Sequence, residues 1–375
     1  MKSKIWLSSP HMGGTEQNYI NEAFETNWIA PLGPNVSGFE LDLENYLGGN
    51  KNVACLSSGT AAIHLALVQL DVKRGDEVLC QTFTFCGSAN PIIYQGATPI
   101  FIDSEMDTWN MCPNHLEEAI KDRISKGIKP KAIIIVHLYG MPAKINELLS
   151  VAKNYNIPVI EDAAEALGST YNSRKCGTFG DFSILSFNGN KIITTSGGGA
   201  LVCNSLDDKK NTIFYATQAR DSAPHYQHSV IGYNYRMSNI SAGIGRGQME
   251  ILDKHVALRQ KMNTFYKESF KNHKGVSVFQ EYTDKIISNH WLSCITISEV
   301  AKFTKEEFQK AMNDANIETR PLWKPMHLQP VFKNTPYYGN HESESLFNKG
   351  LCLPSGSNLT DKDRERINSV IACFN

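Results

Sequence analysis

The sequence predicts an α/β protein whose larger part is a mostly parallel sheet with helices on both faces, followed by a smaller α+β part. Two observations lead to this prediction. Short apolar runs rich in β-branched residues alternate with helical stretches between residues 52 and about 205. These runs are apolar at successive positions, a pattern typical of strands that are buried on both faces of a parallel sheet.

Seven apolar runs in this region are predicted as strands, and the stretches between them as helices. In chain order they are NVACL, EVLCQT, TPIFID, AIIIVHL, IPVIED, SILSF and GALVC. The preceding residues contain Gly and Pro turn signals around one helical stretch, TEQNYINEAFET. We therefore predict an arm over residues 1–40 and a large domain over residues 41–245.

The pattern changes after the seventh strand. Residues 236–270 carry a long helical pattern, and GVSVFQ and HWLSCITI follow it as predicted strands. Two charged amphipathic stretches, TKEEFQKAMNDA and DKDRERINSVIACF, are predicted as helices. These elements predict a smaller α+β domain over residues 246–375 that docks on the large one.

Charge and hydropathy limit the partners of the protein. The 375 residues include 37 Lys and Arg against 38 Asp and Glu, so the formal charge is −1 and no basic stripe is available for a nucleic acid. The first residues lack the apolar core of a signal peptide, and nowhere do about 18 apolar residues run together as a membrane span requires. We expect a cytoplasmic protein with no nucleic-acid or membrane partner.

The nine cysteines are scattered singly, without the CxxC pairs of a metal site or the density of a disulfide scaffold. They predict reduced, mostly buried thiols and no bound metal. A catalytic thiol at Cys86, beside the aromatic Phe85, is the functional alternative. Free cysteine is more often a small core residue, which favours the structural interpretation.

The first motif that indicates chemistry is Ser57-Ser58-Gly59-Thr60, between the strand NVACL and the helical run AAIHLALVQL. Small residues at a helix N-terminus leave backbone N–H groups at the positive end of the helix dipole, which suits a phosphate. The alternative is a Ser or Thr that only caps the helix.

The second motif is the acidic pair Glu161 and Asp162, which closes the strand IPVI. Ligands of open parallel sheets bind at the carboxyl ends of strands, where a carboxylate can meet a cationic ring nitrogen. An acidic residue at a strand end can equally serve as a helix N-cap. The pair alone leaves both roles open.

The third motif is the segment Ser186–Lys191, which follows a buried strand and precedes the glycine run Gly197–Gly199. Glycine lets backbone approach closely, so the lysine can be partly desolvated and act as a neutral amine toward an aldehyde. Most lysines are solvated surface charges. Here the buried strand and the glycines favour a functional lysine.

The three motifs lie along one sheet in the order of a phosphate anchor, an acid, a serine and a lysine. A pyridoxal phosphate site requires donors for the phosphate, an acid that keeps the ring nitrogen protonated, and an amine for the aldehyde. Agreement among independent parts favours this interpretation over unrelated caps and surface charges.

The whole chain resembles the DegT/DnrJ/EryC1/StrS family of sugar aminotransferases, which are fold type I pyridoxal phosphate enzymes that serve bacterial glycan biosynthesis. The resemblance implies a mixed, mostly parallel seven-stranded sheet flanked by helices, and a homodimer with shared active sites. It rests on Trp28-Ile29, SSGTAAIHLAL, QTFTF, IEDAAEALGS, CGTFGDFSILSFNGNKIITTSGGG, GYNYRMSNISAGIG, RPLWKPMH and GLCLPSG.

The resemblance also implies roles for the residues that match the family. Gly59 and Thr60 would bind the phosphate, and Ser186 would add a hydrogen bond to it. Phe85 would stack on the pyridine ring. Asp162 would meet the ring nitrogen.

Lys191 would hold the cofactor covalently, and Asn234 would reach the phosphate from the second subunit. Family members that deoxygenate sugars have His in place of Lys191, so the resemblance excludes that branch. Glu165 stands where many relatives have His, among the polar contacts of the cofactor.

The implied substrates are L-glutamate and a nucleotide-linked keto sugar. The arm resembles the UDP-N-acetylbacillosamine branch, whose acceptor, UDP-4-keto-6-deoxy-N-acetylglucosamine, receives the amine on C4. Arg236 and His327 are candidate substrate contacts, since arginine offers a bidentate fork; an interdomain salt bridge for Arg236 and a packed His327 are the alternatives. The arm residues expected at the substrate are Trp28, Ile29, Ala30, Pro31 and Leu32.

Two other functions stay open on the sequence. One is an enzyme that aminates C3 or uses a dTDP- or GDP-linked sugar. The other is a regulator that keeps the fold without catalysis, because fold does not imply function. The presence of both Lys191 and Asp162 argues against the regulator.

Overall fold

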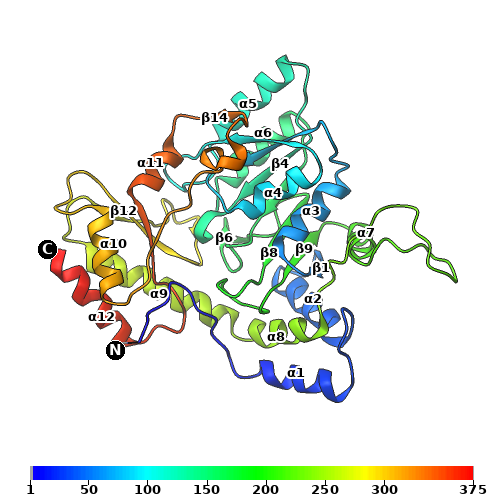
Figure 1. Cartoon of the computed structure of the whole chain (residues 1–375), viewed down its shortest axis with the longest axis horizontal. Coiled ribbons are helices and arrows are strands. Elements are labelled where there is room, and N and C mark those ends of the chain that lie inside the picture. The colour runs from blue at the N-terminus through cyan, green and yellow to red at the C-terminus, as the bar shows by residue number, and fades with distance from the viewer. Residues whose placement is uncertain (1–2, 375) are drawn as a thin grey trace.

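The larger part of the protein is an eight-stranded sheet in this computed structural model, which describes residues 3–374 (Figure 1). The strand order is β1-β9-β8-β5-β4-β2-β3-β14. All neighbours from β8 to β14 pair parallel, whereas β9 pairs antiparallel with both β1 and β8. The strands are β1 (Asn52–Leu56), β2 (Glu77–Gln81), β3 (Thr98–Ile102), β4 (Ala132–Val136), β5 (Val159–Asp162), β8 (Phe182–Ser186), β9 (Gly199–Cys203) and β14 (Tyr337–Tyr338).

The seven predicted strands are all present, which confirms a mixed, mostly parallel sheet. The number seven needs a correction, because β14 adds an eighth strand beside β3. A strand of two residues has no periodicity that a sequence pattern can reveal. The chain thus returns to the large sheet at β14 after it has formed part of the smaller sheet. The predicted boundary between the large and the small domain at residue 245 stays a prediction.

Helices cover both faces of the large sheet, as the apolar runs predict. They are α2 (Pro34–Tyr46), α3 (Gly59–Gln69), α4 (Cys86–Tyr94), α5 (Pro113–Ser125), α6 (Ile145–Asn154) and α7 (Leu206–Ala216). Helix α1 (Glu16–Glu25) lies away from the sheet and packs on α8 (Asn239–Met249) (Figure 1). Along β4, Ile133 and Ile135 join a core with α2, α5 and α6, and Ile134 joins the opposite core with α3 and α4. Within residues 3–374, no helix combines the length and the apolar character needed to cross a bilayer.

The smaller part contains a four-stranded antiparallel sheet in the order β10-β12-β15-β13. Its own core includes Ile295, Phe308 and Ile367. Capping boxes begin its two predicted helices at Thr304 and Thr360. The elements of this part are α9 (Leu252–Phe270), β10 (Val276–Val278), β12 (Ser293–Ile297), α10 (Lys305–Asp314), β13 (Arg320–Pro321), α11 (Glu342–Lys349), β15 (Gly350–Leu353) and α12 (Asp361–Ile371).

A third, three-stranded sheet joins segments that are distant in sequence. Its strands are β6 (Thr170–Tyr171), β7 (Arg174–Lys175) and β11 (Ile286–Ile287).

The helical stretch predicted over residues 236–270 is two helices, which corrects the prediction. Ser238 caps α8 (Asn239–Met249), and Ile251, with a φ of −118°, separates it from α9. The residues at the break fit a helical pattern, so the sequence alone does not predict where α8 ends and α9 begins. Helix α8 packs closely on α1, because a Cβ on Gly247 would lie 2.7 Å from the backbone nitrogen of Glu16.

Gly199 opens β9, and its backbone lies against the segment that joins β1 to α3. A Cβ at this position would overlap the backbone nitrogen of Gly59 and the carbonyl carbon of Ser58. Only glycine leaves room for this approach. The contact brings the glycine run that follows Lys191 beside the motif predicted to bind phosphate.

We expect Gly199→Ala to lower the free energy of unfolding by about 1–3 kcal/mol, because the added methyl group has no space. Gly197→Ala is the matched control, since a Cβ at position 197 would meet no atom within 4 Å. Urea unfolding of the purified variants measures the difference. Equal stabilities would contradict the close approach of β9 to α3.

Candidate active site

The three sequence motifs meet at one cavity of about 390 Å³, a volume typical of small-molecule sites. The cavity lies beyond the carboxyl ends of β1, β2, β5 and β8, where ligands of parallel sheets bind. Seven of the residues predicted to contact the cofactor line it: Gly59, Thr60, Phe85, Asp162, Glu165, Ser186 and Lys191.

The start of α3 forms one end of the cavity. Ser58 caps the helix, and its Oγ accepts a hydrogen bond from the N–H of Ala61 at 3.0 Å. Gly59 and Thr60 occupy the first two helical positions, whose N–H groups have no partner within a helix. Both predicted roles therefore coexist, with Ser58 as the cap and the next two residues at the cavity.

Asp162 is buried at the end of β5. Its Oδ2 accepts a hydrogen bond from Ser88 at 2.7 Å, and its Oδ1 accepts one from the N–H of Ala164 at 3.1 Å. Burial raises the pKa of Asp162, and these two hydrogen bonds offset only part of the increase. The carboxylate forms no ion pair with any residue of the described range 3–374.

Glu161 precedes Asp162 and points to the opposite face of β5, because side chains alternate along a strand. It is fully buried, and it accepts hydrogen bonds from His137 at 3.0 Å and Ser183 at 2.8 Å. Burial alone would raise the pKa of Glu161, but its hydrogen bonds outweigh burial and lower the pKa. Further bonds come from the backbone N–H groups of Gly177, Phe179 and Gly180.

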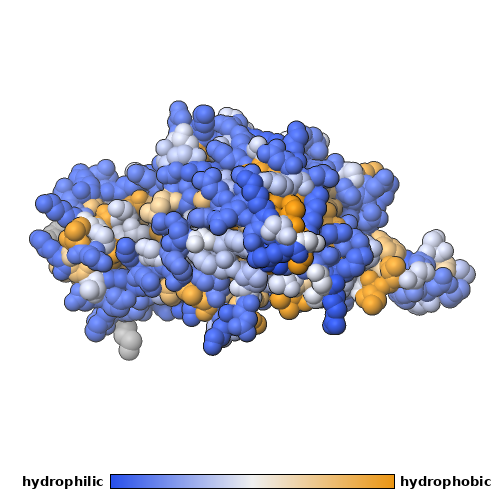
Figure 2. All heavy atoms as spheres, turned by 90° about the horizontal axis from the view of Figure 1, so that it is seen from above, coloured by the Kyte–Doolittle hydropathy of each residue, from blue (hydrophilic) through white to orange (hydrophobic). Residues whose placement is uncertain are grey.

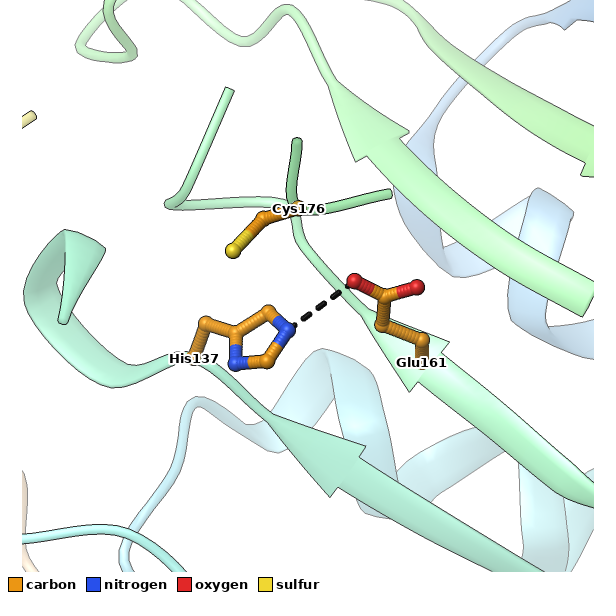
Figure 3. A group of neighbouring side chains, drawn as sticks. All are labelled: His137, Glu161 and Cys176. Carbon is orange, nitrogen blue, oxygen red and sulfur yellow. Dashed lines mark hydrogen bonds and ion pairs between the residues drawn. The ribbon is translucent and has the colours of Figure 1, made fainter. Parts of the chain in front are cut away.

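His137, Glu161 and Cys176 form a buried group of potential metal ligands that the sequence did not reveal (Figure 3). Nδ1 of His137 accepts the N–H of Ala143 at 3.0 Å, so Nε2 carries the proton that it donates to Glu161. The His and Glu atoms that a metal would need are therefore engaged in hydrogen bonds. The group stabilises β5 on the side of the sheet away from the cavity.

Lys191 follows β8 in a turn that its N–H closes onto the carbonyl of Asn188 at 3.0 Å. Its Nζ lies 3.4 Å from Oε1 of Glu165 and 4.0 Å from the centre of the Trp291 ring. The side chain is only 12% exposed. Burial raises the pKa of Glu165, and the nearby lysine opposes that increase.

Aromatic rings form the walls of the cavity. Phe85, the predicted one, is 51% exposed, and its ring centre lies 5.4 Å from that of Trp323. Trp291 and Trp323 also line the cavity and were not predicted. Both come from beyond residue 245, and a single tryptophan carries no sequence signal that separates a site residue from a core residue.

A protein-family model matches almost the whole chain. It covers residues 10–372 and describes the DegT/DnrJ/EryC1/StrS aminotransferase family. The chain belongs to this family. The family resemblance predicted from the sequence is therefore confirmed.

Two relatives cover this aminotransferase along nearly its full length. EpsN of Bacillus subtilis (strain 168), provisionally named a pyridoxal phosphate-dependent aminotransferase, is 50% identical over 99% of this chain and 96% of its own. The GDP-perosamine synthase of Escherichia coli O157:H7 is 37% identical over 96% of this chain and 95% of its own. A crystal structure of a DegT DnrJ EryC1 StrS aminotransferase from Brucella abortus superposes with a TM-score of 0.89 at 28% identity, covering 96% of this chain and 95% of that one.

Pyridoxal phosphate, the predicted cofactor, is confirmed by membership of this family. The cavity fits it in three ways. The N-terminus of α3 suits a phosphate, and the amine of Lys191 suits an aldehyde. The buried, unpaired carboxylate of Asp162 suits a cationic ring nitrogen, which would supply the ion pair that the protein itself does not.

Arg236 and His327 lie outside the cavity of the aminotransferase subunit. Nη1 of Arg236 lies 2.5 Å from Oε1 of Glu40 in a buried ion pair. His327 hydrogen-bonds through Nδ1 to Thr82 at 2.7 Å and through Nε2 to Glu344 at 3.1 Å. These contacts agree with the alternative interpretation of a paired arginine and a packed histidine, and substrate contact by either residue stays a prediction.

Asn234 and the arm residues Trp28–Leu32 also lie outside the cavity. Asn234 is exposed, and its Oδ1 accepts a hydrogen bond from Gln218 at 3.2 Å. Asn239, at the start of α8, donates hydrogen bonds to two arm carbonyls at 2.8 and 3.1 Å. The arm is thus fastened to α8 while most of its side chains remain at the surface.

Cys86 is partly buried and does not line the cavity. Burial raises the pKa of its thiol, which disfavours the thiolate that a nucleophile requires. All nine cysteines are free and six are buried, as predicted for core thiols.

We expect Asp162→Asn to increase the stability of the cofactor-free protein at about pH 8 while it slows amino transfer by roughly 100-fold or more. The folded pKa of Asp162 is raised, so its ionisation destabilises the fold as the pH rises above the unfolded value of 3.8. The stabilisation by Asn should therefore shrink toward about pH 4. Urea unfolding at the two pH values measures it.

Glu161→Gln is the matched control, because the pKa of Glu161 is lowered rather than raised. Its carboxylate stabilises the fold above the unfolded pKa, so this variant should be less stable than the wild type at about pH 8. A loss of stability in Asp162→Asn as large as that in Glu161→Gln would contradict the unpaired state of Asp162.

Proposed function

We propose that this aminotransferase moves the amino group of L-glutamate to C4 of UDP-4-keto-6-deoxy-N-acetylglucosamine for bacterial glycan biosynthesis. The observation that supports amino transfer is the amine of Lys191 and the unpaired carboxylate of Asp162 at one cavity. The arm segment Trp28–Leu32, with its resemblance to the UDP-N-acetylbacillosamine branch, supports the acceptor.

Bound pyridoxal phosphate supplies an aldehyde that carries the amino group and a ring that stores the electrons released at the donor carbon. Lys191 holds the cofactor and, once released, takes the proton from the α-carbon of glutamate. Its amine later delivers a proton at C4 of the sugar. Asp162 keeps the ring nitrogen protonated, and the start of α3 binds the phosphate.

A GDP-linked keto sugar is the second candidate acceptor. The E. coli relative described above is named a GDP-perosamine synthase, and it matches nearly all of this chain. Both candidates share the amino donor and the cofactor. They differ in the nucleotide and in the acetamido group of the sugar, which only the UDP-linked candidate carries.

A homodimer with shared active sites accounts for the residues that face away from the cavity. The loop after α7 extends from the body of the subunit (Figure 1), and apolar side chains gather where this extension meets the body (Figure 2). Tyr226 and Ile231 in this loop are 80% and 82% exposed. Exposed apolar surface of this kind is typical of protein interfaces, and Asn234 follows the loop directly.

Spectroscopy of the amine-loaded cofactor tests the acceptor. We expect UDP-4-keto-6-deoxy-N-acetylglucosamine to restore the visible absorbance of the enzyme at least about 100-fold faster than dTDP-4-keto-6-deoxyglucose, because a missing acetamido group leaves polar partners unpaired. Equal rates, or faster restoration by a GDP-linked keto sugar, would overturn the UDP assignment. Lys191→Ala is the control, and it should show neither the visible absorbance nor turnover.

Subunit mixing tests the shared site. Lys191→Ala and Asn234→Trp should each be inactive, and random exchange between them should restore about a quarter of the wild-type activity, because half of the dimers then carry one intact site. Lys191→Ala mixed with Asp162→Asn is the matched control without rescue, since both residues line the same subunit's cavity. No rescue despite proven exchange would place Asn234 outside the partner's site.

A further inference from the structure

Trp291 lies beside the amine of Lys191 and has no role in the function proposed above. Nζ of Lys191 lies 4.0 Å from the centre of the indole ring. A cation in that position is attracted by the negative face of the ring, and the attraction grows when water is excluded. Trp291 is 1% exposed and the Lys191 side chain 12%, so both partners of the contact are largely shielded from solvent.

Three hydrogen bonds fix the position of Trp291. Its indole Nε1 donates to the carbonyl of Asn190, the residue before Lys191, at 2.7 Å. Its carbonyl accepts a hydrogen bond from Arg259 at 2.6 Å, and its backbone N–H donates to Oδ1 of Asn289 at 2.8 Å. The ring therefore has little freedom to move when the lysine moves.

The same contacts connect Trp291 to the carboxylate on the other side of the amine. Nδ2 of Asn289 donates to the carbonyl of Glu165 at 2.9 Å. Oε1 of Glu165 lies 3.4 Å from Nζ of Lys191. The amine of Lys191 thus lies between the ring of Trp291 and the carboxylate of Glu165, and Asn289 links these two residues through hydrogen bonds.

The charged groups around Lys191 lie at different positions. Glu165 and Asp162 are acidic and line the same cavity as the amine. Arg259 is basic and fully buried; it bonds the Lys191 carbonyl at 3.3 Å rather than the amine. Trp291 is the neutral member of the set, and its contribution depends on the ring face alone.

We propose that Trp291 is a positioning residue that holds the ammonium of Lys191 beside the cavity while this side chain moves a proton within each half-reaction. This inference rests on the proposed function, in which released Lys191 is the proton carrier. When the C–H bond of glutamate breaks, the amine would gain the proton as an ammonium, and the ring of the bound cofactor would take up the electron pair. The ring face holds that ammonium within reach of the cavity until the proton is returned.

Chemical labelling of Lys191 in the cofactor-free protein tests the proposal. Acetic anhydride reacts only with the neutral amine, and mass spectrometry reports the labelling rate at this one residue. We expect Trp291→Leu to label about ten-fold faster than the wild type at about pH 8, after each pH profile is normalised to its own alkaline plateau. The normalisation removes any change in reagent access.

Trp291→Phe is the matched control, because it keeps an aromatic face but removes the indole N–H. We expect its normalised rate to stay within about two-fold of the wild type. Equal acceleration in the Phe and Leu variants would overturn the proposal and assign the effect to the lost hydrogen bond to Asn190. An unchanged rate in Trp291→Leu would overturn it as well.

A ring-fluorinated tryptophan placed at position 291 keeps the shape and the N–H while it weakens the negative face, and it replaces Trp291→Leu if that variant does not fold. It should also accelerate normalised labelling, and an unchanged rate would overturn the proposal. These measurements need neither cofactor nor sugar. Failure of the acceptor assay would therefore reject the proposed function without affecting the labelling result.

Discussion

The active site depends on how β5 presents two consecutive carboxylates to opposite faces of the sheet. Glu161 is fully surrounded by hydrogen-bond donors, which anchors the strand deep in the protein. Asp162 is also buried, but within residues 3–374 it accepts hydrogen bonds from two neutral donors alone. The folded protein therefore keeps a destabilising negative charge at the cavity, and a cationic ring nitrogen would compensate it.

The lysine side of the site is held by parts of the chain that are distant in sequence. The carbonyl of Asn190 accepts hydrogen bonds from Trp291 and, at 2.6 Å, from Ser8 in the arm. Arg259 on α9 bonds the next carbonyl and the hydroxyl of Ser8. The turn that carries the reactive amine is thus fixed by the arm, α9 and the strand region of the smaller part together.

The residues predicted to contact the cofactor, except Asn234, line the cavity, whereas those predicted to contact the substrate lie outside it. The predicted substrate residues of the arm, and Asn234, face outward. Arg236 and His327 are engaged in internal contacts. The proposed homodimer would account for this arrangement, because a second subunit could bring exposed segments to the cavity.

The sequence by itself determined the class of fold, the cofactor and most of the residues that line the cavity. Buried strands leave continuous apolar runs, and Gly59, Asp162, Ser186 and Lys191 follow such strands directly, so local pattern was enough to place them at one edge of the sheet. The exact acceptor sugar did not follow from these residues, because the roles predicted for them concern the cofactor and not the sugar.

Only the tertiary structure decided the strand β14, the break between α8 and α9, and the contact of Trp291 with Lys191. The short strand pairs with residues more than 200 positions away, and Trp291 meets Lys191 from a distance of 100 residues. The tertiary structure also showed that Arg236 forms an ion pair with Glu40 and does not line the cavity. Such contacts join segments that no local periodicity relates, since a side chain's partner is set by how the whole chain packs.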